Sequence, residues 1–197
     1  EGAMISDFGG EYLMTLLVKR IVSIALSFKE IKYDNFNIEK HIQILLKNDC
    51  NMTNSSIKKC VKLLQKFENV LKENATFCHG DMTLSNLIME LATGRIYFID
   101  PEQDKEASSY LLDLAKLRMS LMGYEQRFGL SKSKFDLSGI LNSFDNELKS
   151  TGVYDIVFIL NYMYIIRLWR YKDVKGKNIV LEMLKEMEGR IDYLLLK

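Results

Sequence analysis

Residues 87–99 read LIMELATGRIYFI, and this stretch decides the fold that we expect. Its two ends, residues 87–91 and 95–99, are short apolar runs, and the second is rich in the β-branched and aromatic side chains that favour strands. Between them, Ala92-Thr93-Gly94 is a turn signal. The stretch therefore predicts a β-hairpin.

The segments on both sides of the hairpin have the apolar spacing of helices. Upstream, the pattern predicts helices over residues 13–28, 38–47 and 54–71, the last of which Asn54 or Ser55 can cap. Downstream, it predicts helices over residues 110–121, 137–148, 156–171 and 178–196. With residues 1–4 set aside, only helical patterns are visible before His79.

The fold class that follows is mainly α with a small β-hairpin, an α+β fold. We expect a single unit over residues 5–197, because no proline- or glycine-rich linker divides the chain. Its parts are N-terminal helices (5–76), a central loop with the hairpin (77–104) and C-terminal helices (105–197).

Charge and cysteine content exclude several classes of function. Lys plus Arg number 27 and Asp plus Glu 26, so the balance does not favour binding to a nucleic-acid backbone. Cys50, Cys60 and Cys78 lack the spacing of a zinc site or a disulfide framework, which predicts free thiols in a reducing compartment. The early apolar stretch 12–28 contains Lys19 and Arg20 and is too short to span a bilayer. We therefore expect a soluble, cytoplasmic protein that binds neither membranes nor nucleic acid.

Oxygen-bearing side chains gather at the open end of the predicted hairpin. With the turn centred near Thr93, Asn86 and Asp100 each lie seven residues from it. Facing residues of paired strands are about 4.5–5.5 Å apart, so these two side chains can share one Mg²⁺ ion. Asp81 precedes Asn86 by a short loop, which brings a further carboxylate to the same place. Phosphoryl transfer to a hydroxyl requires such a carboxylate beside a magnesium site.

Three motifs resemble the signature of the aminoglycoside phosphotransferase superfamily, which includes choline, ethanolamine, homoserine and sugar kinases. They are His79-Gly80-Asp81 with Asn86, then IDPE at residues 99–102, then LDLAKL at residues 112–117. The spacing from His79 to Asn86 also equals that of the protein-kinase catalytic loop. The resemblance covers residues 77 to 117 and implies a protein-kinase-like C-terminal lobe.

The resemblance also implies roles for individual residues. Asp81 would be the catalytic base, and Asn86 and Asp100 would bind the Mg²⁺ that holds ATP or GTP. Asp113 would brace the catalytic loop from the start of a helix, and His79 would support the site. The implied reaction moves a phosphoryl group to a hydroxyl of a sugar, amino sugar or amino alcohol.

The chain departs from the family before residue 77. Family members have a β-rich N-terminal lobe with a loop over the phosphates and a lysine that holds ATP. Here no strand pattern flanks Gly9-Gly10 on both sides, so we expect the ATP lobe to be missing or reduced and supplied in cis or in trans. Alone, the chain should then bind ATP poorly and have little or no activity.

Further residues carry weaker expectations. The His79 ring should hydrogen-bond the loop or the region of Asp100, and His41 should lie on the surface. Glu102, Tyr164 and Arg167 are candidates for substrate contact, although packing in the core with a polar rim equally explains the last two. Other functions stay open: a non-catalytic module that binds or scaffolds small molecules, and a magnesium-dependent phosphohydrolase, for which no nucleophile signature is visible.

Overall fold

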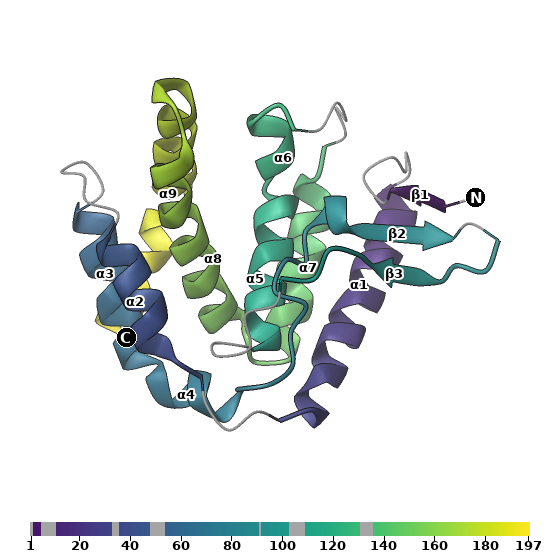
Figure 1. The fold of residues 1–197 in the computed structure, drawn as a ribbon, viewed down its shortest axis with the longest axis horizontal. Helices are drawn as coiled ribbons and strands as arrows, with labels where there is room; N and C mark the ends of the chain where they lie inside the picture. The colour runs from purple at the N-terminus through teal and green to yellow at the C-terminus, as the bar shows by residue number, and fades with distance from the viewer. Residues whose placement is uncertain are drawn as a thin grey trace.

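Helices make up most of the chain in the computed structural model, and a small antiparallel sheet lies at one end (Figure 1). The structure describes residues 2–4, 11–32, 36–47, 54–90, 92–102, 109–130 and 136–197. The prediction of a mainly α chain with a small β-hairpin is confirmed. Gly9, Gly10, Cys50, Leu91 and the side chain of Leu13 lie outside the described part.

The helices that precede the central loop are amphipathic. They are α1 (Glu11–Ser27), the 3₁₀ helix η2 (Phe28–Glu30), α2 (Ile38–Leu46), α3 (Asn54–Lys66) and α4 (Glu68–Glu73). In α2 the side chain of Asn37 caps the first turn, and Ile38, Ile42 and Leu45 lie on its buried face. The expected helix 54–71 is interrupted at Phe67, the residue that separates α3 from α4.

The helices after the loop form the centre of the molecule. They are α5 (Tyr110–Leu121), α6 (Tyr124–Arg127), α7 (Ser138–Ser150), α8 (Tyr154–Leu168), the 3₁₀ helix η5 (Trp169–Tyr171) and α9 (Val174–Leu196). Every residue from 156 to 166 of α8 is buried, because α5 packs on one side of this helix and α3 and α9 pack on the other. The four helices expected here are confirmed, and the short α6 was not predicted.

The sheet contains the predicted hairpin and a strand that was not predicted. Strands β2 (Leu87–Glu90) and β3 (Ile96–Phe98) pair antiparallel, and β1 (Gly2–Met4) pairs with the other edge of β2. That strand lies within residues 1–4, which were set aside from the prediction of only helical patterns before His79. Three residues are too short for a recognisable alternation, and the partner strand supplies the pairing.

The register of the hairpin differs by one residue from the prediction. Leu87 faces Phe98, and the Ile99 N–H donates to the Asn86 carbonyl at 3.0 Å. Asn86 therefore pairs with Ile99, and Asp100 follows one residue beyond the pair. Both predicted magnesium ligands still lie at the open end of the hairpin.

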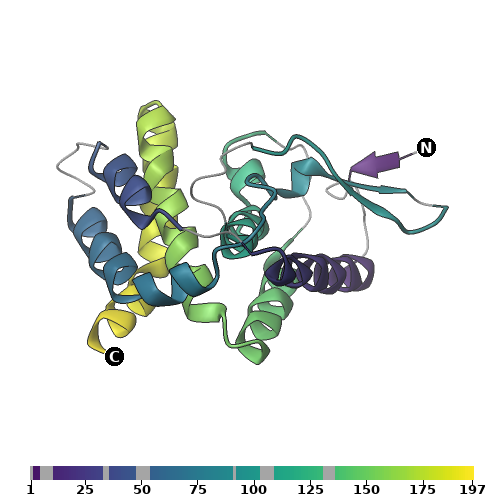
Figure 2. The ribbon, with the colours of Figure 1, turned by 60° about the horizontal axis from the view of Figure 1, so that its bottom comes forward.

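The arrangement of the helices positions the central loop. Figures 1 and 2 both place α1 and the sheet at one end of the molecule and α3 and α9 at the other, with α5 between them. Residues 77–86 cross over α5 on their way from α4 to β2. In α5 only Lys116 is not fully buried, so this helix is a rigid support for the loop. Within the described part, no helix is both long and apolar enough to cross a membrane.

Candidate functional site

One face of α5 holds the central loop along its length. Asp113, Lys116 and Ser120 lie three and four residues apart, so their side chains project from the same side of the helix. They contact the loop in chain order, at His79 and Gly80, at Asp81 and at Leu84 respectively. The loop conformation is therefore fixed by side chains of a buried helix as well as by its own backbone.

The first of these contacts is the buried carboxylate of Asp113. Its two oxygens accept hydrogen bonds from the backbone N–H groups of His79, at 2.7 Å, and Gly80, at 2.8 Å. Burial raises the pKa of Asp113 to about 7. The two backbone donors and the positive charge of Lys116 lower this pKa, but their effect is smaller than that of burial. This is the contact expected of a residue that braces the loop.

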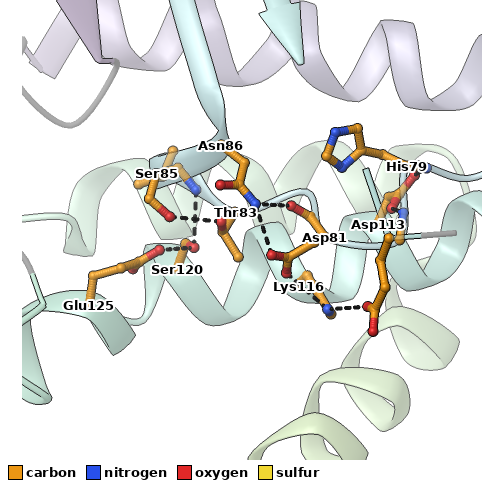
Figure 3. A network of polar contacts seen from close by, with 12 residues as sticks. His79, Asp81, Thr83, Ser85, Asn86, Asp113, Lys116, Ser120 and Glu125 are labelled. Carbon is orange, nitrogen blue, oxygen red and sulfur yellow. Dashed lines mark hydrogen bonds and ion pairs between the residues drawn. The ribbon is translucent and has the colours of Figure 1, made fainter. Parts of the chain in front are cut away.

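Asp81 and Asn86 are in direct contact. The Asn86 side-chain Nδ2 donates to the Asp81 Oδ2 at 2.8 Å and to the Asp81 carbonyl at 2.9 Å (Figure 3). On its other oxygen, Asp81 Oδ1 accepts from Lys116 Nζ at 2.9 Å. The Asp81 side chain keeps 39% of its surface exposed, so its direction is fixed from both sides while it stays accessible.

A second buried carboxyl supports the end of the loop. The Ser120 hydroxyl accepts from the Leu84 N–H at 3.2 Å and donates to Glu125 Oε1 at 2.5 Å. Burial is the main cause of the raised pKa of Glu125. Leu84 begins the short 3₁₀ helix η3 (Leu84–Asn86), which turns the chain from the loop into β2. This contact therefore sets the position of Asn86 at the start of the strand.

The segment that follows β3 docks on Gly80. The Glu102 N–H donates to the His79 carbonyl at 2.9 Å. Gly80 has a φ of +84°, and a Cβ placed there would lie 2.7 Å from the Glu102 carbonyl oxygen. Glycine is therefore required at this position both by the backbone conformation and by the close approach. Lys116 joins the same segment, because its Nζ lies 3.1 Å from Glu102 Oε2.

Asp100 has an unusual backbone conformation. Its φ is +55°, in the left-handed region that residues other than glycine rarely adopt. Such residues cluster at functional sites, where the surrounding structure fixes the strained conformation. Here Ile99, just before Asp100, donates its N–H to the Asn86 carbonyl. Glu102, two residues after Asp100, donates its N–H to the His79 carbonyl. The exposed Asp100 carboxylate forms no hydrogen bond or ion pair with a described residue.

Asn86 and Asp100 bring two oxygen-bearing side chains to the open end of the hairpin. Because Asn86 Nδ2 is directed at Asp81, the amide oxygen is left for another partner. With the Asp100 carboxylate, the open end of the hairpin offers two oxygen ligands of the kind that Mg²⁺ prefers. Among the described residues there is no group of three or more His, Cys, Asp or Glu side chains suited to a metal. Any magnesium here therefore depends on ligands from nucleotide phosphates and water as well.

The two histidines differ from the predictions. The His79 ring is buried against Phe98, with ring centroids 6.0 Å apart, and neither of its nitrogens hydrogen-bonds a described residue. Burial lowers the pKa of the His79 ring. The nearby backbone groups of Ile99 and Asp81 act in the opposite direction, although neither forms a hydrogen bond with the ring. His41 is 6% exposed and stacks on Phe36, so the prediction of a surface histidine is wrong. His41 shares the buried face of α2 with Ile38 and Ile42.

The candidate substrate residues come together. Glu102, Tyr164 and Arg167 line one pocket, with Gly80 of the loop and Lys40 of α2 also in its wall. Tyr164 is 7% exposed, and the centroid of its ring lies 5.2 Å from Lys116 Nζ and 5.4 Å from the Arg167 guanidinium. Asp81 is not in the described lining, but Lys116 Nζ connects it to the pocket, at 2.9 Å from Asp81 Oδ1 and 3.1 Å from Glu102 Oε2.

No match to this chain is found among protein-family models, curated proteins or solved structures. The resemblance to aminoglycoside phosphotransferases consequently rests on the motifs themselves. Residue by residue, the structure brings Asp81, Asn86 and Lys116 into contact and places Asp100 at the adjoining end of the hairpin. Sequence reasoning missed Lys116 and Ser120, although polar residues recurring on one face of an otherwise apolar helix are a detectable signal.

Proposed function

We propose that this chain is the catalytic and substrate-binding lobe of a cytoplasmic small-molecule kinase. It would move the γ-phosphoryl group of ATP or GTP to a hydroxyl of a small metabolite such as a sugar, amino sugar or amino alcohol. The observation that carries the proposal is the contact between Asp81 and Asn86 at the open end of the hairpin, where Asp100 adopts a strained conformation.

In the proposed mechanism, Asp81 orients and deprotonates the acceptor. Each of its carboxylate oxygens accepts one hydrogen bond, from Lys116 or from Asn86, and keeps a lone pair for the incoming hydroxyl. The hydroxyl oxygen bonds to the γ-phosphorus as the bond from that phosphorus to the nucleotide oxygen breaks. The proton of the hydroxyl passes to the Asp81 carboxylate.

Asn86 and Asp100 would hold Mg²⁺ and, through it, the nucleotide phosphates. When bound, the ion would neutralise the phosphate oxygens and fix their orientation. A lobe that encloses the adenine and the β-phosphate would come from elsewhere in a longer chain or from a partner. We therefore propose that this chain alone binds the nucleotide weakly and transfers phosphate slowly.

A binding or scaffold module derived from a kinase lobe is the alternative function. It would use the pocket of Glu102, Tyr164 and Arg167 and would have no need for an oriented carboxylate at Asp81. The two functions therefore differ in the effect of substitutions at Asp81 and Asp100.

The test is transfer of radiolabelled γ-phosphate from magnesium-ATP and magnesium-GTP to a panel of small alcohols. Asp81→Asn should lower the transfer rate by about 100-fold or more with little change in nucleotide affinity, because the amide cannot accept the proton. Asp100→Ala should instead raise the dissociation constant for the magnesium nucleotide, because it removes a charged ligand.

Asp192→Asn provides the control, since that carboxylate belongs to α9 and pairs with Lys59 away from the site. Its rate should match that of the natural sequence. Transfer that is equally fast in all three variants would show that the assigned roles are wrong. Binding of small alcohols without any transfer dependent on Asp81 would favour the binding module.

A further inference from the structure

The pocket beside Asp81 is lined by cationic side chains, and we infer that it binds an anionic group, phosphate or carboxylate, on the acceptor. This inference rests on the proposed function, since it names the class of acceptor for that reaction. The acceptor would be a compact polyhydroxy molecule with its negative group in the pocket and its hydroxyl toward Asp81.

Arg167 is the residue on which the inference depends most. It projects from the last turn of α8 into the pocket, half-buried, with its guanidinium 5.4 Å from the centre of the Tyr164 ring. No described carboxylate pairs with it. Elsewhere in the described structure the buried Arg118 and the half-buried Arg190 both have carboxylate partners. A guanidinium presents paired donors that match the oxygens of phosphate or carboxylate.

A second cation lies in the wall formed by α2. Lys40 lines the same pocket as Arg167, although the two residues are far apart in the sequence and lie on separate helices. Lys116 adds a third positive charge, with its Nζ 5.2 Å from the centre of the Tyr164 ring. Positive charge therefore comes to this place from α2, α5 and α8.

The acidic residues at the pocket do not cancel this charge. Glu102 is the acidic member of the lining, and its carboxylate is already paired with Lys116 at 3.1 Å. Asp81 shares the same lysine. Arg167, which pairs with no described carboxylate, thus leaves a positive charge in the described lining, which attracts an anionic acceptor and disfavours a cationic amino alcohol.

The remaining walls of the pocket are closely packed. Tyr164 is 7% exposed, and the centre of its ring lies 5.2 Å from Lys116 Nζ and 5.4 Å from the Arg167 guanidinium. The backbone of Glu102 packs on Gly80. We therefore place only the anionic group of the acceptor in the pocket, with its hydroxyls outside it and directed toward Asp81.

The inference is tested by calorimetric titration of the full 197-residue chain with glucose 6-phosphate, glucuronate and glucose, without nucleotide or magnesium. At least one anionic probe should bind about 10-fold more tightly than glucose. Arg167→Gln should weaken that binding by about 10- to 100-fold, and Arg167→Lys should restore part of it. The matched control is Arg170→Gln, an exposed arginine of the same segment that stacks on Tyr171.

Each outcome decides between the possibilities. Binding of glucose 6-phosphate that depends on Arg167 supports a phosphorylated acceptor, and the same result with glucuronate supports a carboxylated one. Equal binding of glucose and the anionic probes, or equal losses in Arg167→Gln and Arg170→Gln, would overturn the inference. So would loss of magnesium-ATP binding in Arg167→Gln with unchanged binding of both anionic probes.

The result does not depend on catalysis. Asp81→Asn should bind the anionic probe at least as well as the natural sequence, because it removes a negative charge near the pocket. Failure of the transfer assay therefore leaves this measurement valid, and failure here leaves transfer to an uncharged acceptor possible.

Discussion

At the scale of single residues, Asp113 connects the stability of the fold to the geometry of the site. Its carboxylate is fully buried and accepts the backbone N–H groups that precede Asp81. Burial disfavours the charge more than these donors and Lys116 favour it, so the pKa of Asp113 rises to about 7. The loop therefore rests on a carboxyl group that titrates near neutral pH.

This shift predicts the pH dependence of stability with a definite sign. Since the pKa of Asp113 is about 7 in the folded state and about 3.9 when unfolded, the folded state binds the proton more tightly. The stabilisation from this group is complete below the unfolded pKa and is lost as pH rises through the folded pKa, by up to about 1.4 kcal/mol per pH unit. In urea unfolding, the free energy of the natural chain minus that of Asp113→Asn should fall between about pH 5 and about pH 8.

The comparison with Asp113→Asn removes the contributions of other titrating groups. Asp136 gives a control of opposite character, because Ser138 lowers the pKa of this exposed carboxylate. The corresponding difference for Asp136→Asn should stay flat or rise with pH. A difference for Asp113→Asn that rises with pH would show that the two backbone donors outweigh burial.

At the scale of elements, a buried ion pair holds α5 against its neighbours. Arg118 of α5 makes a bidentate contact with Asp145 of α7, at 2.9 and 2.8 Å, and donates to Asn161 of α8 at 2.8 Å. Its guanidinium also lies 4.6 Å from the centre of the Phe158 ring. The helix that carries Asp113, Lys116 and Ser120 is thereby fixed on the face opposite the loop.

Removing one partner of this pair should destabilise the protein strongly. Asp145→Ala leaves the Arg118 charge buried and uncompensated, and we expect a loss of about 3–5 kcal/mol in the free energy of unfolding. The double variant Arg118→Met/Asp145→Ala should recover most of that loss, because it removes both charges. Urea unfolding of the single and double variants measures both quantities.

The control is the exposed pair of Arg127 and Glu186, which has the same bidentate geometry at 2.8 and 3.0 Å. Glu186→Ala should cost no more than about 1 kcal/mol, because solvent screens surface pairs. Equal losses at the two pairs would mean that the Arg118 pair does not hold α5 in place.

At the scale of the whole molecule, the sequence pattern predicts the individual helices and the hairpin. It does not predict how distant segments pack together. The hairpin and the helices from residue 110 onward follow from alternation and helical spacing, and the contact of Asp81 with Asn86 follows from their separation along one loop. The strand β1 and the left-handed φ of Asp100 depend on pairing and docking between distant segments. Such tertiary contacts leave no periodic signal.

The same limit applies to the pocket. Tyr164 and Arg167 were candidates from their helix, but Lys40 comes from α2 and joins them only through the packing of α2 and α8. His41 was misjudged because its ring is polar, although its position follows the buried spacing of α2. Lys116 and Ser120 were within reach of sequence reasoning, since both share the face of α5 marked by Asp113.

The central claim is that Asn86 and Asp100 hold the metal of a nucleotide beside Asp81. The most direct measurement is titration of Mn²⁺ with ATP into the ¹⁵N-labelled chain, because manganese uses the same oxygen ligands as magnesium and broadens nearby amide signals even when binding is weak. The account predicts selective broadening at residues 81, 86 and 100 that disappears in Asn86→Ala/Asp100→Ala. Broadening centred on another part of the chain, or unchanged in the double variant, would contradict it.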